Sequence, residues 1–228
     1  MTKIIHIIQQ LSLGGASRAL IATAKYSSQQ SPVQHQVISL LPLDTRALEI
    51  AQAAGISVIN APDRTRLTAE LQSADIVQVH FWNVPELYEF LQLKLPPIRL
   101  VIWFHIAGDK PPQVVTKPLI DYADFAIACS PYTYENSVFQ SLSPEVKLQK
   151  TGMVYGAADF ARLSNLQPQS HSTFNVGYIG TVHFSKLHRN YVSMSAAIAI
   201  PNIRFIICGP GMGQYLQQQA QQLRCLHS

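Results

Sequence analysis

The sequence predicts an α/β protein with one complete doubly wound domain, followed by the first strands and helices of a second domain of the same kind. Two observations predict this fold. Short apolar or β-branched runs alternate along the chain with segments that have helical spacing and are rich in Ala and Leu. The runs are almost continuously apolar, which is typical of parallel strands that are covered on both faces of their sheet.

The first domain is expected to contain six such strands. They are residues 4–8, 36–41, 56–60, 76–80, 100–105 and 125–130, and the helices expected between them are 16–26, 45–54, 67–73 and 85–93. In sheets of this kind, ligands bind beyond the carboxyl ends of the strands. The residues that directly follow each run are therefore the first candidates for a functional site.

A linker and an incomplete second domain are expected after the first. Residues 155–173 are rich in Ala, Gln, Ser, Asn and Pro and lack a strand or helix period, which indicates an interdomain linker. We assign most of this linker to the first domain and therefore predict domains at 1–168 and 169–228. The second domain is expected to consist of strand 174–180, helix 185–198, strand 203–208 and helix 214–223.

Two strands are too few for an independent domain. Residues 224–228 carry no helix stop signal, so we expect an interrupted reading frame and a chain that is truncated within its second domain. The open sheet edge that results would favour instability or aggregation.

Composition limits the function classes. The 228 residues are 47% hydrophobic and 13% charged, with a formal net charge of +4. This charge permits contact with phosphate or with an anionic membrane face, but the chain lacks the basic stripe or aromatic platform of a nucleic-acid binder. The three cysteines fit no disulfide or zinc pattern, and we expect Cys129 and Cys208 to be buried. The N-terminus reads as a strand, not as a signal peptide, so a cytoplasmic protein is the simplest expectation.

Several segments together resemble the family-4 glycosyltransferases of the GT-B architecture, in which two Rossmann-like domains face each other. The resemblance covers nearly the whole chain. It rests on the first strand and glycine loop at 4–8 and 13–18, on ADIVQVH at 74–80, on YADFAIACS at 122–130, on VYGAAD at 154–159, and on VGYIG at 176–180 followed by Lys186. The resemblance implies sugar transfer, with retention, from a nucleotide-sugar donor to a hydroxyl acceptor, in glycan or polysaccharide synthesis.

Such a transfer leaves a nucleoside diphosphate, so the site must stabilise negative charge, and the resemblance implies no obligatory metal or other cofactor. Gly14 and Gly15 can bring backbone N–H groups close to a phosphate at the start of a helix, although an ordinary tight turn would look the same. By resemblance, Gly180 and Lys186 belong to the donor loop of the second domain, and Lys186 supplies a positive charge. Arg18 could reach a phosphate or simply be solvated.

Acceptor-side and catalytic residues are expected after two neighbouring strands. The resemblance places His105 where the family often has a cleft histidine, with a core histidine as the open alternative. His80 and Trp82 are candidates for the acceptor pocket, or for packing under the next helix. Asp109 is a candidate base for the acceptor hydroxyl, or a turn former. Asp159 is expected to cap or position the linker.

The chain departs from the family pattern in its second domain. Thr181 stands where many members have arginine, and Leu187 replaces the glycine that usually follows the lysine. No Asp or Glu occurs after Asp159, so the family's donor-binding glutamate pair is missing. Two other functions therefore remain open: a non-catalytic relic or acceptor-binding subunit of a glycosyltransferase, and a nucleotide-sugar epimerase of related architecture. Expected partners are a nucleotide sugar, a glycan, lipid-linked or small-molecule acceptor, a complementing chain, and the inner membrane face as a peripheral contact.

Overall fold

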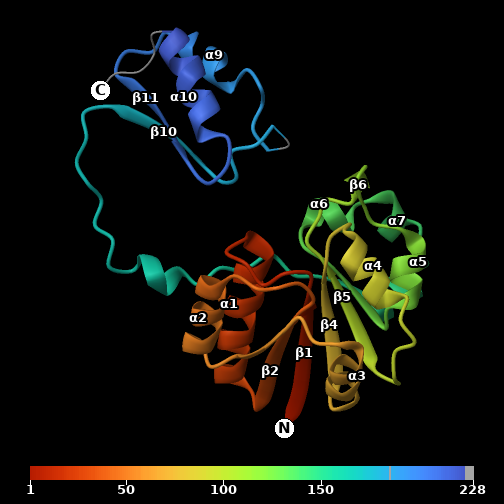
Figure 1. Cartoon of the computed structure of the whole chain (residues 1–228). Helices are drawn as coiled ribbons and strands as arrows, with labels where there is room; N and C mark the ends of the chain where they lie inside the picture. Colours follow the sequence, from red (N-terminus) through yellow and green to blue (C-terminus); the bar gives the residue numbers. More distant parts are fainter. Residues whose placement is uncertain (185, 224–228) are drawn as a thin grey trace. The chain divides into compact units, whose positions relative to one another are not determined.

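A computed structural model describes residues 1–184 and 186–223. The chain divides into two compact units, Met1–Ser164 (unit 1) and Asn165–Ser228 (unit 2), and the boundary lies after Ser164, whereas the sequence places it after residue 168 (Figure 1). Among the described residues, no helix is both long enough and apolar enough to span a bilayer.

Unit 1 is built on a parallel sheet of seven strands in the order β3-β2-β1-β4-β5-β8-β9. The strands are β1 (Thr2–Ile8), β2 (Val33–Ser39), β3 (Ser57–Asn60), β4 (Ile76–Phe81), β5 (Arg99–Phe104), β8 (Phe125–Ala128) and β9 (Thr151–Met153). The chain adds β2 and β3 on one side of β1 and then continues with β4 on the other side. The strand order therefore reverses between β1 and β4, the position at which doubly wound folds bind ligands.

Helices cover both faces of this sheet, as Figure 1 shows. They are α1 (Gly15–Gln30), α2 (Thr45–Ala53), α3 (Arg64–Gln72), α4 (Pro85–Leu91), α5 (Lys117–Tyr122), α6 (Pro131–Tyr134), α7 (Ser137–Gln140) and α8 (Pro144–Lys150), and a short hairpin pairs β6 (Asp109–Lys110) with β7 (Gln113–Val114). Aspartates fix where two of the helices begin, because the Asp44 carboxylate accepts from the N–H groups of Arg46 and Ala47, and Asp63 accepts from Arg66.

The apolar core of unit 1 has two layers because strand residues alternate between faces. Ile5 and Ile7 of β1 pack in the layer that includes Leu67 and Leu71 of α3 and Leu87 of α4. Ile8 packs in the opposite layer, with residues of α1 and α2. His6 has the same orientation as Ile8 and is also buried, which places an imidazole among the buried isoleucines of β1.

Unit 2 is a single β-α-β-α segment. Its strands β10 (Phe174–Ile179) and β11 (Ile203–Cys208) pair in parallel, and α9 (Tyr191–Ala196) and α10 (Gly213–Gln222) pack beside them. Its small core consists of Val182, Leu187, Val192 and Leu216. A short 3-10 helix, η1 (Phe160–Leu163), lies near the C-terminal end of unit 1 and precedes unit 2 in the sequence.

The doubly wound α/β class is confirmed. Its sheet has a seventh strand, β9, that was not expected, and two further details are wrong. The helix expected at 185–198 begins only at Tyr191, because Lys186 and Leu187 donate their N–H groups to the His183 carbonyl in a turn that carries Leu187 into the core. Cys208 is exposed, not buried, since it ends β11 on a thinly covered sheet. Ser185 and residues 224–228, including Cys225, lie outside the described residues.

Gly209 lies where the loops after β10 and β11 approach each other most closely. A Cβ atom on this residue would lie 1.7 Å from the Gly180 carbonyl oxygen, so the two loops that follow β10 and β11 approach only if residue 209 is glycine. We expect Gly209→Ala to destabilise unit 2 by about 1–3 kcal/mol, the usual cost of overpacking. Hydrogen exchange of β10 and β11 measures the effect. Gly177→Ala is the matched control, because its Cβ would meet no atom within 4 Å; equal exchange in the two variants would contradict the expectation.

Candidate functional site

Three of the predicted segments meet at the carboxyl edge of the sheet of unit 1. Gly14 and Gly15 follow β1, Trp82 follows β4, and His105 follows β5, and these three strands are neighbours in the order β1-β4-β5. His105 extends the ladder by one step, because its backbone N–H donates to the Phe81 carbonyl at 2.9 Å. The topology therefore brings the glycine turn and the two candidate acceptor strands to one edge.

The glycine turn forms an open helix start. Gly14 caps α1 without any side-chain hydrogen bond, and the first turn of α1 contains no acidic residue. Ser12 accepts from the Gly14 N–H at 3.3 Å, and a Cβ atom on Gly15 would meet nothing within 4 Å. Packing within the protein thus does not require a glycine at position 15. The free N–H groups and the helix dipole leave room for an anion.

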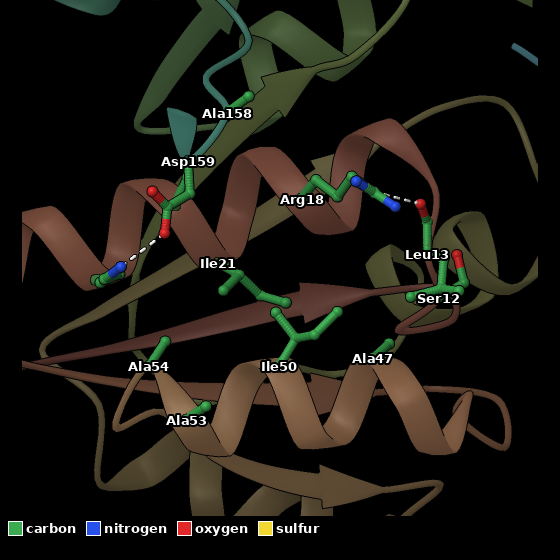
Figure 2. Close-up of a pocket in the computed structure, with 12 residues that line it drawn as sticks. Ser12, Leu13, Arg18, Ile21, Ala47, Ile50, Ala53, Ala54, Ala158 and Asp159 are labelled. Carbon is green, nitrogen blue, oxygen red and sulfur yellow. Dashed lines mark hydrogen bonds and ion pairs between the residues drawn. The ribbon is translucent and has the colours of Figure 1, made fainter. Parts of the chain in front are cut away.

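Arg18 is turned back onto this loop and does not extend into solvent. Its Nε donates to the Leu13 carbonyl at 2.8 Å. Figure 2 shows Arg18 at one end of a cavity of about 380 Å³ between α1 and α2, where Ile21 and Ile50 line the walls. The cavity is mainly apolar, so Arg18 stabilises the loop and borders an apolar space.

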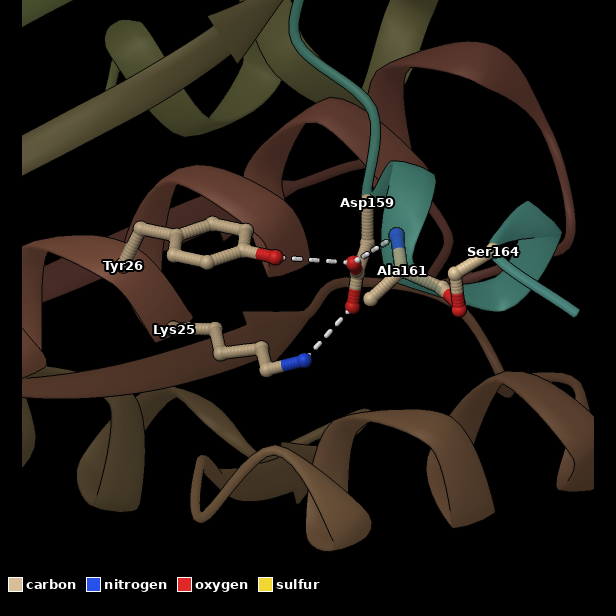
Figure 3. Close-up of polar contacts among 5 residues, drawn as sticks. All are labelled: Lys25, Tyr26, Asp159, Ala161 and Ser164. Carbon is tan, nitrogen blue, oxygen red and sulfur yellow. Dashed lines mark hydrogen bonds and ion pairs between the residues drawn. The ribbon is translucent and has the colours of Figure 1, made fainter.

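Asp159 anchors the end of unit 1 to α1, as expected from the sequence. Its carboxylate accepts from Lys25 Nζ at 2.6 Å and from the Tyr26 hydroxyl at 2.9 Å, and it also caps η1 by accepting from the Ala161 N–H (Figure 3). The hydrogen bonds from Lys25 and Tyr26 lower the pKa of Asp159 and raise the pKa of both donors. The segment that leads to Ser164 is thereby fixed along α1.

Four histidines form a continuous chain across the sheet. His35 Nδ1 lies 2.8 Å from His6 Nε2, His6 Nδ1 lies 3.0 Å from His80 Nε2, and His80 Nδ1 lies 2.9 Å from His105 Nε2. Both His6 and His80 are fully enclosed. The chain starts near the amino end of β2, crosses β1 and β4, and ends at His105.

Burial keeps these imidazoles neutral. Desolvation lowers the pKa of His6 to about 3 and that of His105 to about 4, and it holds the pKa of His80 well below its usual value. The pKa of His35 is lowered for the same reason. At neutral pH each ring therefore carries one proton, which leaves it one donor nitrogen and one acceptor nitrogen.

Trp82 connects two of the edge loops. Its indole Nε1 donates to the Gln9 side-chain oxygen at 3.2 Å, and Gln9 Nε2 donates to a Glu86 carboxylate oxygen at 2.8 Å. This network joins the residues after β1 to the start of α4. Sequence reasoning missed Gln9 and Glu86, since nothing in their local pattern distinguishes them from solvated polar residues.

Asp109 lies apart from His105 in its contacts. It is exposed in β6, where it accepts from the Tyr132 hydroxyl at 2.7 Å, and this hydrogen bond raises the pKa of Tyr132. Asp109 lines a second cavity of about 380 Å³ together with Glu135 and Asn136. Neither cavity is lined by His80 or His105. The geometry therefore does not join Asp109 and His105 as an acid–base pair.

In unit 2, Gly180 and Lys186 lie in the loop after β10. The Gly180 N–H donates to the Cys208 carbonyl at 3.0 Å, and Lys186 is exposed in a turn before α9. Helix α10 also begins without a side-chain cap or an acidic first turn, at Gly213. Unit 2 thus presents a second glycine-rich turn and one exposed lysine.

No group of three or more His, Cys, Asp or Glu side chains in the described part of the chain could hold a metal ion. The histidine chain illustrates why. Its nitrogens are only 2.8–3.0 Å apart, the separation of directly hydrogen-bonded rings, whereas a tetrahedral metal at about 2.0–2.1 Å from two imidazoles would hold their nitrogens about 3.3 Å apart. Successive rings of the histidine chain contact each other directly.

Comparison with solved structures identifies the architecture. A glycosyltransferase from Rickettsia africae ESF-5 superimposes with a TM-score of 0.66 at 15% identity, covering 98% of this chain and 66% of that protein. The fold is of the GT-B type. A putative UDP-N-acetylglucosamine 2-epimerase from Listeria monocytogenes matches with a TM-score of 0.59 at 11% identity, covering 99% of this chain and 67% of that one.

A third similar structure is an alpha-glucosyltransferase (AGT) in complex with UDP, with a TM-score of 0.59 at 12% identity over 98% of this chain and 62% of that one. The chain thus spans about two thirds of the length of these proteins. A scan against protein-family models and a search of curated proteins find no match. At such low identities, the structural similarity establishes the fold.

Proposed function

We propose that the protein is a glycosyltransferase that uses a nucleotide-sugar donor, with UDP as the nucleotide. The observation that carries the proposal is the open glycine turn at the start of α1, which leaves backbone N–H groups free for an anion at the edge where this fold binds ligands. The UDP complex of the alpha-glucosyltransferase with the same fold supports this choice of nucleotide.

We assign the finer roles on the same basis. Gly14 and Gly15 contact the phosphates of the donor, and Gly180 and Lys186 form the donor loop of unit 2. His105 contacts the ligand from the end of β5. His80 and Trp82 shape the acceptor side of this edge, although neither lines the two cavities described above. Membership of family 4, transfer with retention to a glycan, lipid-linked or small-molecule acceptor, and independence of a metal are parts of this proposal that follow from the sequence resemblance.

A UDP-sugar epimerase is the second candidate, because the Listeria protein of that description shares the fold. The two reactions differ in their second substrate. A transferase releases UDP only as the sugar passes to an acceptor hydroxyl, whereas an epimerase needs no acceptor and inverts a centre of the sugar. Product analysis with and without added acceptor separates them. A subunit that binds without catalysis would show nucleotide binding and neither reaction.

Nucleotide binding is tested by thermal unfolding of the purified chain with millimolar UDP, GDP or uridine. We expect UDP, and not uridine, to raise Tm, since only the diphosphate engages the glycine turn; a ligand at 100 times its Kd adds about 2.7 kcal/mol of stability.

Gly15→Glu and Gly15→Gln form a matched pair for this test, because neither side chain meets packed atoms at its Cβ. The glutamate places a negative charge where the diphosphate is proposed to lie. We expect Gly15→Glu to weaken UDP binding at least about tenfold, or about 1.4 kcal/mol, relative to Gly15→Gln. Equal UDP affinities for the two variants would show that the diphosphate does not bind at this turn. Lys186→Ala tests the donor loop of unit 2 by the same measurement of UDP affinity.

A further inference from the structure

The histidine chain follows from strand register. His6 lies opposite Val37 of β2 and Gln78 of β4, and His80 lies opposite Trp103 of β5. Each next histidine is thus displaced by two residues toward the carboxyl edge, which keeps all four side chains on one face of the sheet. The result is a diagonal line of imidazoles that ends where ligands bind.

Hydrogen bonding couples the tautomers of the four rings. Each link joins Nδ1 of one ring to Nε2 of the next, and each link needs one proton. If two neighbours adopted different tautomers, their link would hold two protons or none. All four rings must therefore be Nδ1–H or all must be Nε2–H.

The far end of the chain favours one of these two states. His35 Nε2 is buried and has no hydrogen-bond partner among the described residues. A buried N–H without an acceptor is rarer in proteins than an acceptor that is incompletely satisfied. The favoured state therefore leaves His35 Nε2 without its proton and places a proton on every Nδ1, including that of His105.

We propose that His6, His35 and His80 are positioning residues that hold His105 in the Nδ1–H tautomer, so that His105 donates a hydrogen bond to a ligand oxygen at the carboxyl edge of the sheet. Nδ1 of His105 makes no hydrogen bond within the described part of the chain, and the ring is partly exposed. The identity of the oxygen, on a sugar or a phosphate, rests on the proposed function; the tautomer does not.

This arrangement gives His105 a defined role. A ring held as Nδ1–H is a donor at its exposed nitrogen and does not accept a proton there. His105 can act as a base through Nδ1 only if the protons of all four rings reverse together, which would place an N–H on the unpartnered Nε2 of His35. The histidine chain thus makes His105 a hydrogen-bond donor to an oxygen atom of the ligand.

The test is a long-range ¹H–¹⁵N spectrum of the histidine-labelled full chain at pH 7, in which protonated and unprotonated ring nitrogens have well-separated ¹⁵N shifts. We expect His6, His35, His80 and His105 all to be Nδ1–H. A mixture of tautomers among the four would overturn the coupling, and four Nε2–H rings would overturn its direction. The exposed His171 provides the reference for a ring outside the chain.

His35→Asp tests the coupling at a distance. A carboxylate at position 35 is an acceptor for His6 Nε2–H, so the protons of the remaining rings reverse and His105 changes from mostly Nδ1–H to mostly Nε2–H. A folded variant with unchanged His105 would overturn the proposal; if the variant does not fold, the wild-type tautomers decide. Adding UDP to the same samples separates the tautomer proposal from the proposed function. If all four rings are Nδ1–H but UDP changes no signal, the result counts against UDP as the nucleotide and leaves the tautomer proposal intact.

Discussion

Lowering the pH from 7 to 5 is expected to destabilise unit 1, by about 2 kcal/mol through the buried imidazole of His6 alone. The folded pKa values lie below the ordinary value of 6.5, at about 3 for His6 and about 4 for His105. Between these values and 6.5 the unfolded chain binds more protons than the folded one, so the free energy of unfolding falls as the pH falls. The loss begins near pH 6.5 and continues to about pH 4 for His105 and about pH 3 for His6.

Urea unfolding at pH 7, 6 and 5 measures this effect, followed by tryptophan fluorescence. Both tryptophans of the chain, Trp82 and Trp103, belong to unit 1, so the signal reports that unit alone. Repeating the series at higher salt is the control, because salt screens repulsion between surface charges but not the cost of charging a buried ring. A free energy of unfolding that is constant from pH 7 to 5 would show that the imidazoles are not buried as described.

Removing His6 is expected to have the largest effect of any single substitution considered. His6→Ala leaves Nδ1 of His35 and Nε2 of His80 without partners inside the protein. Each unsatisfied buried group costs about 1–3 kcal/mol, so we expect a total loss of about 3–5 kcal/mol once the cavity is included. The same fluorescence measurement gives the value.

Two further variants separate lost hydrogen bonds from lost volume. His6→Leu fills the space but supplies no polar partner, so it is also expected to be clearly destabilised. His171→Ala, at an exposed position of unit 2, is expected to change the stability of unit 1 by less than about 0.5 kcal/mol. Wild-type stability in His6→Leu would mean that the histidine chain contributes no net hydrogen bonding.

Local pattern was enough to predict six of the seven strands of unit 1, because buried parallel strands are continuous apolar runs; β9 was not expected, since it spans only Thr151–Met153. The run at 76–80 is β4 in the structure, and the glycines after the first run begin α1. The short helices α5 to α8 and the hairpin β6–β7 were not expected, since segments of two to seven residues carry too little periodicity. The first helix of unit 2 was predicted to begin too early, because the backbone N–H groups of Lys186 and Leu187 donate to the His183 carbonyl in a turn before α9.

Site residues were predictable only where they end a strand. His80 and His105 could be named because each follows or completes an apolar run, but their mutual contact depends on the register between β4 and β5. His6 and His35 lie inside or at the start of strands, where a single polar residue looks like an interruption. Their displacement by two residues per strand becomes apparent only when the strand order is known.

We expect the turn after β1 to bind the diphosphate of a UDP-sugar. The most direct measurement is amide hydrogen exchange of the full chain with and without saturating UDP. Saturating UDP is expected to slow exchange at residues 14–18, with exchange in β3 unchanged as the internal reference. Binding of UDP that leaves residues 14–18 unprotected, or no protection anywhere, would contradict it.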